Sequence, residues 1–254
     1  MIAICPNPFR DSELKYTRQA AEMLHAAGYE TAVCPVFAED APQMIPEDIK
    51  ATTLDAVRSR CSLVVVIGGD GTILSAARQL HNADIPILGV NLGSKGFMAA
   101  LEPEHMQLIV KAAAGEYTVS RRMMLDIELE RGGEIIYRDK ALNDVVLHGY
   151  GDCIRLTAWC AGDRITSFSG DGIILSTPTG STGYSMSAGG PIVEPEASAI
   201  IVSPICAHMM SARSYVLSAS HDVSVLAEKL HGRRAYISVD GNSVMDLANG
   251  DLLR

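Results

Sequence analysis

The sequence lacks the two best-known motifs for binding phosphate groups. The pattern Gly-x-x-x-x-Gly-Lys-Ser/Thr does not occur in the 254 residues, which excludes a P-loop of the usual kind. No strand-like run is followed by Gly-x-Gly-x-x-Gly, which excludes the usual dinucleotide fingerprint of a Rossmann fold. A nucleotide site in this chain must therefore be built from a different loop.

Cysteine and histidine are few, and their spacing is not that of a zinc site. The six cysteines stand at positions 5, 34, 61, 153, 160 and 206, and no Cys-x-x-Cys pair occurs. Several of them lie in apolar runs, which is typical of small core residues. The sequence therefore predicts no metal site made of protein ligands, and it favours a reducing, cytoplasmic compartment.

Long apolar runs are also missing. Residues 1–6 carry no basic charge and too short an apolar run for a signal peptide, and no apolar run reaches membrane-spanning length. The 30 acidic residues outnumber the 21 basic ones, and the net charge of −9 argues against a general nucleic-acid surface. We therefore expect neither a membrane nor a nucleic acid as a partner.

The first half of the chain alternates between strand-like and helix-like segments. This alternation predicts an α/β domain, with an open, mainly parallel sheet and helices on both of its faces. Residues 38–50 are expected to form a proline-containing, acid-rich loop. The expected strands cover residues 2–5, 31–36, 63–67 and 85–90, and the expected helices cover residues 12–27, 52–60, 72–80 and 102–114.

From Arg122 onward, short strands and turns dominate. Their spacing predicts antiparallel hairpins and a β-rich, layered second domain. We expect the domain boundary between residues 115 and 122, with a first domain of residues 1–118 and a second of residues 119–254. The expected strands cover residues 124–131, 134–138, 142–148, 154–161 and 164–168.

The apolar run 63–67 leads directly into Gly68-Gly69-Asp70-Gly71-Thr72. A buried strand, a glycine-rich turn and a helix aim free backbone N–H groups at an anion, and glycine lets a ligand approach the backbone closely. We therefore expect phosphate binding at this turn, by Gly68, Gly69, Gly71 and Thr72. Because Asp70 would repel phosphate, its presence indicates a general base for a hydroxyl group or a holder of a cation. The alternative is a plain turn in which Asp70 is the helix N-cap.

Two further stretches combine glycines with polar side chains. Residues 91–97, Asn-Leu-Gly-Ser-Lys-Gly-Phe, follow the next strand at the same edge of the sheet. Residues 170–191 take an apolar strand into a run of hydroxyls and glycines, and then into a small-residue helix that starts near Thr179. Hydroxyls and helix N-termini suit ribose and phosphate. The alternatives are an ordinary loop for the first stretch and tight helix–sheet packing, with locally satisfied hydroxyls, for the second.

Together these motifs resemble those of the NAD kinases. Gly-Gly-Asp-Gly-Thr alone also resembles loops of lipid kinases and of phosphofructokinase relatives, but residues 176–191, Ser-Thr-Pro-Thr-Gly-Ser-Thr-Gly-Tyr-Ser-Met-Ser-Ala-Gly-Gly-Pro, are much more specific. Asn143-Asp144, residues 203–208 and Val239-Asp240-Gly241 also fit, so the resemblance runs from the first strand nearly to the end.

The sequence departs from the family pattern at four places. These are Lys95, Gly183, Ser214 and the chain end at Arg254, where family members continue into an arm that packs on the first domain. None of these departures removes a residue with an expected catalytic role. The last residues of this chain could themselves pack back on the first domain.

The resemblance implies an activity and its cofactors. It implies transfer of a phosphoryl group from ATP, or from polyphosphate, to the 2′-hydroxyl of the adenosine ribose of NAD, which gives NADP. Asp70 would be the catalytic base, and Mg²⁺ or another divalent cation would be bound mainly by triphosphate oxygens. The family also implies a homodimer or homotetramer.

The resemblance implies a set of NAD-binding residues as well. Asn143 and Asp144 would bind ribose hydroxyls, and Asp171 would meet the nicotinamide end, with a turn aspartate as the alternative. His208 could reach a phosphate, with a structural histidine as the alternative. The whole NAD-binding set is Asp70, Gly71, Phe97, Asn143, Asp144, Asp171, Thr182, Tyr184 and Ser187.

Two other functions compete with this interpretation. One is a related Gly-Asp-Gly kinase acting on a lipid or sphingoid hydroxyl, which would need a large apolar channel or a membrane-facing surface. The other is a catalytically silent dinucleotide-binding regulator, which would lack the base, whereas Asp70 is present.

Overall fold

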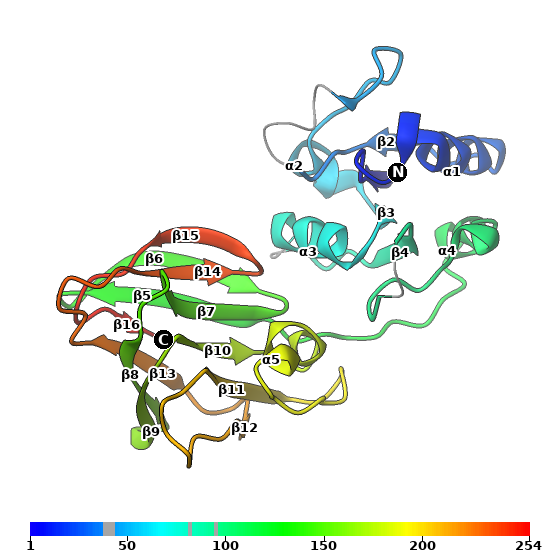
Figure 1. Cartoon of the computed structure of the whole chain (residues 1–254). Helices are drawn as coiled ribbons and strands as arrows, with labels where there is room; N and C mark the ends of the chain where they lie inside the picture. The colour runs from blue at the N-terminus through cyan, green and yellow to red at the C-terminus, as the bar shows by residue number, and fades with distance from the viewer. Residues whose placement is uncertain (38–43, 81–82, 94–95) are drawn as a thin grey trace. The chain divides into compact units, whose positions relative to one another are not determined.

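The computed structural model describes residues 1–37, 44–80, 83–93 and 96–254. The chain divides into two compact units, Met1–Val119 and Ser120–Arg254, and each is described by itself (Figure 1). Part of the expected acid-rich loop, residues 38–43, and the departure at Lys95 lie outside the described residues. Within the described residues, every helix is too short or too polar to span a membrane.

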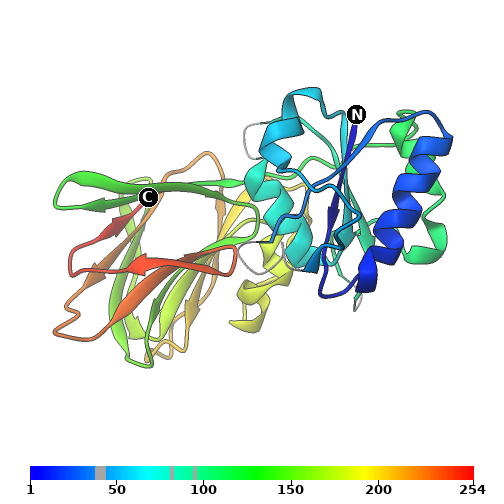
Figure 2. The ribbon, with the colours of Figure 1, turned by 90° about the horizontal axis from the view of Figure 1, so that it is seen from above.

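The first unit is built on a four-stranded parallel sheet in the order β2-β1-β3-β4. The central strand β3 is buried along its whole length because helices cover both faces of the sheet (Figure 2). Leu63, Val65 and Ile67 pack on one side with α1 and α4, and Val64 and Val66 pack on the other with α2 and α3. The strands are β1 (Ile2–Pro6), β2 (Thr31–Val33), β3 (Leu63–Gly68) and β4 (Ile87–Asn91), and the helices are α1 (Lys15–Ala26), α2 (Leu54–Val57), α3 (Asp70–Gln79) and α4 (Leu108–Ala113).

Three of the expected helices are shorter than the sequence predicts, and the one expected over residues 52–60 consists of α2 followed by a 3-10 turn, Arg58–Arg60. The segment expected to be helical from residue 12 begins with a 3-10 turn, in which Glu13 and Leu14 have φ angles of 53° and 54°. The α-helix starts only at Lys15, where the Asp11 carboxylate accepts the N–H groups of Tyr16 and Thr17 at 2.9 Å each. The helix expected over residues 102–114 likewise consists of a 3-10 turn, Pro103–His105, followed by α4.

The second unit contains two six-stranded sheets, in the orders β12-β11-β10-β7-β14-β15 and β6-β5-β16-β13-β8-β9. All neighbouring strands within them are antiparallel. The strands are β5 (Leu125–Arg131), β6 (Glu134–Ala141), β7 (Asp144–Gly149), β8 (Ile154–Cys160), β9 (Asp163–Gly170), β10 (Gly172–Ser176), β11 (Ala199–Ile205), β12 (Tyr215–Ser218), β13 (Val223–Glu228), β14 (Ala235–Val239), β15 (Asn242–Asp246) and β16 (Leu252–Leu253).

Apolar side chains from both sheets of the second unit form one core. Alternate residues of β5 and β8, such as Ile127 and Leu156, pack against alternate residues of β7 and β10, such as Leu147 and Ile173. This is the arrangement of a β-sandwich, in which each strand turns every second side chain inward. The predicted fold class, a parallel α/β part followed by a β-rich layered part, is confirmed.

The last residues of the chain belong to the second unit. Leu252 and Leu253 form β16, which pairs with β13 on one side and β5 on the other. They therefore complete a sheet of their own unit, because a turn after β15 returns the chain beside β5 (Figure 1).

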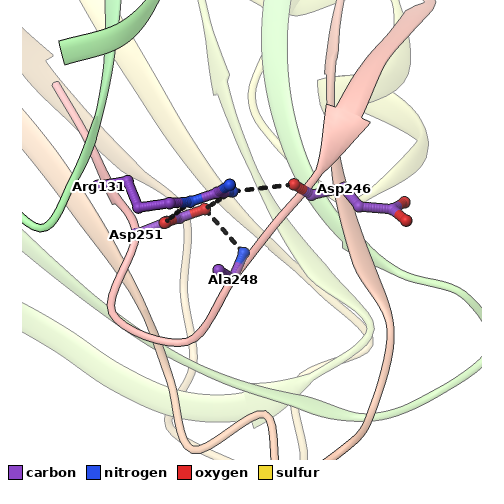
Figure 3. A network of polar contacts seen from close by, with 4 residues as sticks. All are labelled: Arg131, Asp246, Ala248 and Asp251. Carbon is purple, nitrogen blue, oxygen red and sulfur yellow. Dashed lines mark hydrogen bonds and ion pairs between the residues drawn. The ribbon is translucent and has the colours of Figure 1, made fainter. Parts of the chain in front are cut away.

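An ion pair between a buried carboxylate and a partly exposed arginine fastens this turn. The Asp251 carboxylate is fully buried and accepts Nε and Nη2 of Arg131 at 2.8 and 2.7 Å, and the N–H of Ala248 at 2.8 Å (Figure 3). Arg131 Nη2 also donates to the carbonyl oxygen of Asp246 at 3.1 Å. A charge on Asp251 is tolerated in the interior only because these donors surround it.

The variant Arg131→Met should therefore lower the stability of the second unit. It removes the cation from a buried carboxylate, which costs about 1–3 kcal/mol or more. Urea unfolding followed through the fluorescence of Trp159, the single tryptophan of the chain, reports this unit. The control is Arg138→Met, which removes an exposed arginine from a partly exposed partner, Glu128, and which should cost less than about 1 kcal/mol. Equal losses in both variants would contradict a special role of the pair between Arg131 and the buried Asp251.

Candidate functional site

The Gly-Gly-Asp-Gly turn lies where β3 ends and α3 begins. Gly69 is the N-cap of α3, in extended conformation, and Asp70 is the first helical residue. The alternative in which Asp70 is the N-cap is therefore wrong. The Asp70 carboxylate instead accepts the backbone N–H groups of Phe97 at 2.8 Å and Met98 at 3.3 Å. A Cβ at Gly96 would lie 2.7 Å from Asp70 Cγ, so the loop can approach the carboxylate only with glycine there.

Other residues of the turn hold it in place. Thr72 is buried, its Oγ1 accepts Nδ2 of Asn7 at 3.1 Å, and its N–H donates to Gly69 O at 2.9 Å. A Cβ at Gly68 would lie 2.9 Å from Thr72 Cβ, so Gly68 is explained by packing. Gly71 differs, because it is exposed and an added Cβ would meet no atom within 4 Å. At Gly71 a close approach by a ligand is the remaining reason for glycine.

The loop after β4 is shaped by Asn91. Its Oδ1 accepts the N–H of Gly93 at 3.1 Å, and its Nδ2 lies 3.4 Å from a carboxylate oxygen of Glu102. The side chain of Phe97 is 65% exposed, and its N–H is the group that holds Asp70. The first unit therefore brings together Asp70, the α3 N-terminus and the loop ending in Phe97.

In the second unit, Asn143 and Asp144 lie at the start of β7, and Asp240 fixes their backbone. The Asp240 carboxylate accepts the N–H groups of Leu142, Asn143 and Asp144 at 2.9, 2.7 and 3.1 Å. The N–H of Asp240 donates in return to the carbonyl oxygen of Asp144 at 2.9 Å. Asp240 follows β14 directly and has a φ of 46°, a conformation that non-glycine residues seldom adopt.

Thr177 holds the same segment from its other side. Thr177 Oγ1 donates to Leu142 O at 2.6 Å, and its N–H donates to Asn143 O at 2.8 Å. All six backbone polar groups of residues 142–144 thus have partners, which is required of a largely buried segment. We call this arrangement of Asp240 and Thr177 around residues 142–144 the backbone clamp. Gly180 packs against it, since a Cβ there would lie 2.7 Å from Asn143 Cα.

The side chains that the backbone clamp positions have features of a binding site. Asn143 Oδ1 is buried and has no hydrogen-bond partner among the residues that the structure describes. Burial, and then the negative charge of Asp240, raise the pKa of Asp144 to about 7. A buried acceptor without a donor and a carboxylate with a strongly shifted pKa both favour a site that a polar ligand completes.

The Tyr184 hydroxyl interacts electrostatically with both Asp144 and Asp171. Burial raises the pKa of Tyr184, and its neighbours Tyr236, Cys206, Asp171 and Asp144 raise it further. Hydrogen bonding to Asp171 raises the pKa of the Cys206 thiol. Two of the expected NAD-binding residues, Asp144 and Asp171, therefore each lie within electrostatic reach of a third, Tyr184.

The hydroxyl-rich stretch does not form the continuous helix that the sequence predicts. A 3-10 turn, Gly180–Thr182, is followed by the short helix α5, Tyr184–Ser187, with Gly183 (φ −97°, ψ −128°) between them. Such a short helix offers no regular N-terminal anion site. The buried Ser181 donates to Pro178 O at 2.6 Å and accepts from Val193 N at 3.0 Å, as the packing alternative predicts.

The remaining candidate residues have more open surroundings. Thr182 is partly exposed and donates to Thr179 O at 3.2 Å, while Tyr184 is 41% exposed and Ser187 is exposed. His208 follows β11 and is also exposed. Its N–H donates to Ser169 O at 2.8 Å, and its ring lies beside Cys153, with Nδ1 3.8 Å from Sγ.

The fit of a divalent cation depends on the available oxygen ligands. Among the described residues, no group of three or more His, Cys, Asp and Glu side chains could hold a metal ion. Near the Gly-Gly-Asp-Gly turn, Asp70 is a carboxylate that could contact a cation, but both of its oxygens already accept backbone N–H groups. These residues fit a cation whose ligands come mainly from a bound triphosphate.

Two family models match the chain, and together they cover almost all of it. The ATP-NAD kinase N-terminal domain matches residues 2–117, and the ATP-NAD kinase C-terminal domain matches residues 124–254. The chain is 36% identical over 255 residues to the NAD kinase of Acetivibrio thermocellus, which covers 99% of this chain and 87% of that protein.

Two solved structures are similar to this one. Yeast NADH kinase complexed with NADH has a TM-score of 0.86 and 28% identity, over 99% of this chain and 76% of that chain. An NAD kinase from Archaeoglobus fulgidus in complex with ATP has a TM-score of 0.76 and 25% identity, over 100% of this chain and 89% of that chain. The chain therefore belongs to the ATP-NAD kinase family.

Proposed function

We propose that this protein transfers the terminal phosphoryl group of ATP to the 2′-hydroxyl of the adenosine ribose of NAD, giving NADP. The observation that carries the proposal is the backbone clamp, which holds Asn143 and Asp144 within a chain that both ATP-NAD kinase domain models match. The similar structures, an NADH kinase with NADH and an NAD kinase with ATP, support the choice of the two substrates.

In this proposal, the second unit binds NAD. The Asp144 carboxylate accepts hydrogen bonds from ribose hydroxyls, and a donor of the ligand satisfies the buried Oδ1 of Asn143. Asp171 meets the nicotinamide end. Thr182, Tyr184 and Ser187 line the adenine and ribose site, and Phe97 is a further NAD-binding residue of the proposal.

Phosphate groups are bound by the Gly-Gly-Asp-Gly turn. Gly68, Gly69 and Thr72 shape the turn, in which the N–H of Gly69 donates to Thr72 Oγ1 at 3.4 Å, and the N–H of Gly71 binds phosphate. Asp70, held by two backbone N–H groups, orients the 2′-hydroxyl and takes its proton, and Gly71 also contacts NAD. Mg²⁺ or another divalent cation, bound with the triphosphate, would neutralise part of its charge, which is a main requirement of phosphoryl transfer.

Three further properties belong to the same proposal. The chain divides into two domains, residues 1–118 and residues 119–254. The first carries the phosphate-binding turn, and the second binds NAD. The family resemblance implies a homodimer or homotetramer, which light scattering would measure. The six cysteines are free thiols, which favours a reducing compartment such as the cytoplasm.

An assay with purified protein tests the activity directly. NADP formed from NAD, ATP and Mg²⁺ is measured with an NADP-specific dehydrogenase, and parallel reactions contain NADH, polyphosphate or sphingosine. We expect NADP formation that depends on a phosphoryl donor. Phosphorylation of sphingosine without NADP formation would overturn the proposal in favour of the lipid kinase alternative, which none of the matches reported above supports.

The variant Asp70→Asn should lose most turnover and keep NAD binding. The amide retains size but cannot take the hydroxyl proton, so we expect kcat to fall by about 10²–10⁴-fold. Measurement of kcat under saturating ATP and Mg²⁺, with NAD affinity from calorimetry, separates the two effects. Asp55→Asn, an exposed carboxylate of the same unit, is the control. A kcat close to the wild-type value would remove Asp70 from the role of base.

The variant Asp144→Asn should weaken NAD binding and remove its pH dependence near neutrality. The ionised carboxylate accepts from ribose hydroxyls, and its pKa is about 7, so NAD affinity of the wild type should rise as the pH increases from 6 to 8. Asp144 faces the Asp240 carboxylate and the Tyr184 hydroxyl, which stay in the variant. Calorimetry at several pH values should show about a tenfold loss of affinity at pH 8 and a flat profile.

The raised pKa of Asp144 also makes the stability of the folded protein depend on pH. Because the pKa of Asp144 is raised from 3.8 to about 7, the folded state binds the proton more tightly, and Asp144 lowers stability as the pH rises between these values. Asp126→Asn, an exposed position on β5, is the control for both measurements. A pH profile of NAD binding identical in wild type and Asp144→Asn would contradict the role of Asp144.

A further inference from the structure

Arg10 belongs to none of the motifs identified in the sequence, yet its turn is fastened to the candidate phosphate site. The N–H of Arg10 donates to Asn7 O at 3.0 Å. Asn7 in turn donates its N–H to Ile67 O at 2.8 Å and its Nδ2 to Thr72 Oγ1 at 3.1 Å. The backbone of Arg10 is therefore held to the end of β3 and to the first turn of α3.

The guanidinium of Arg10 lies against two glycines from separate loops. A Cβ at Gly69 would lie 3.2 Å from Arg10 Nη1, and a Cβ at Gly93 would overlap the same nitrogen. Neither glycine has a positive φ. Glycine is therefore explained at both positions by the lack of a side chain and not by a backbone conformation that other residues avoid. Asn91 fixes Gly93 by accepting its N–H at 3.1 Å. Gly69 and Gly93, from two separate loops, thus leave the space that one guanidinium group occupies.

The charge of Arg10 is available to a ligand. The side chain is exposed, and within the described residues its guanidinium has no hydrogen-bond or ion-pair partner. Its five donors form a planar fork that matches phosphate oxygens. The turn that contains Gly69 also carries Asp70, whose negative charge repels phosphate, so a cation beside Gly69 offsets an unfavourable interaction.

We propose that Arg10 is a phosphate-binding residue, which holds the triphosphate of ATP together with the N–H of Gly71. The inference rests on the proposed kinase function for the identity of the nucleotide. It accounts for glycine at positions 69 and 93, because a side chain at either position would displace the guanidinium. It also gives the loop after β4 a role in phosphate binding, since Asn91 holds Gly93 in the position that contacts Arg10.

The first test removes the charge. Arg10→Gln should raise the KM for ATP and the Kd for inorganic tripolyphosphate by about tenfold or more, because a charged hydrogen-bonding group is lost. The Kd for NAD should not change. Arg10→Lys should restore part of the affinity, since it keeps the charge and loses the fork. Arg60→Gln, which removes an exposed arginine elsewhere in the first unit, is the matched control and should leave all constants unchanged.

The second test moves the guanidinium without removing it. Gly93→Ala should weaken tripolyphosphate binding by at least about threefold when Arg10 is present, and should have almost no effect in the Arg10→Gln background. Such coupling is expected only if Gly93 acts through Arg10. The displaced atoms are the end of a flexible side chain, so both variants should keep the wild-type melting temperature.

The outcomes separate this proposal from the proposed function. Unchanged tripolyphosphate and ATP constants in folded Arg10→Gln, with normal NADP formation, would overturn the role of Arg10 and leave the kinase function intact. Equal effects of Gly93→Ala in both backgrounds would also overturn it. Tripolyphosphate binding that depends on Arg10, in a protein that forms no NADP, would support Arg10 and refute the kinase function.

Discussion

The candidate NAD site depends on one carboxylate that is expected to touch no substrate. Asp240 accepts three consecutive backbone N–H groups, from Leu142 to Asp144, and so sets the direction in which Asn143 and Asp144 point. Removing a partner from a largely buried N–H group costs about 1–3 kcal/mol, so this backbone has little freedom to rearrange while Asp240 is present. A binding group held this way pays less entropy when its ligand arrives.

The arrangement has an electrostatic consequence. The negative charge that orders the backbone also lies close to Asp144 and, together with burial, raises the pKa of that carboxylate to about 7. The same protein group therefore positions Asp144 and makes its charge depend on pH in the physiological range. A ligand that donates hydrogen bonds to Asp144 would favour the ionised form and offset the unfavourable proximity of the two carboxylates.

The first unit uses the same principle with different residues. Backbone N–H groups of Phe97 and Met98 orient Asp70, and the absence of a side chain at Gly96 lets them approach it. In both units, hydrogen bonds between backbone N–H groups and a carboxylate from a segment distant in sequence position the candidate functional residue: Asp70 accepts them itself, and Asp144 is held through its own backbone by Asp240. The side chains expected to do chemistry are therefore only as well placed as the loops that contact them.

The sequence predicted the motifs whose residues are contiguous and missed the contacts between residues that are distant in the chain. The apolar run of β3, the glycine turn and Asp70 are contiguous, so their pattern alone predicts them. The role of Asp240 was missed because its partner Leu142 lies 98 positions away, and no periodic pattern connects the two. Arg10 was missed for the same reason, since its relation to Gly69 and Gly93 exists only after the loops fold together.

Helix ends were also mispredicted, for identifiable reasons. Left-handed backbone at Glu13 and Leu14 delays α1, and Gly183 interrupts the helix expected from Thr179. Propensity favours helix at Glu13 and Leu14, but hydrogen bonding to Asp11 decides where α1 begins, whereas glycine at 183 itself disfavours a continuous helix.

The most direct measurement of the central claim is the NAD affinity of Asp240→Asn, determined by calorimetry on protein shown by Trp159 fluorescence to be folded. The amide keeps the size of the side chain but can no longer accept all three N–H groups with a full charge. If the backbone clamp positions Asn143 and Asp144, NAD should bind about tenfold more weakly or worse, and the pH midpoint of the remaining binding should move below 7 because the neighbouring charge is gone. NAD binding as tight as in the wild type, with the same pH dependence, would contradict the account.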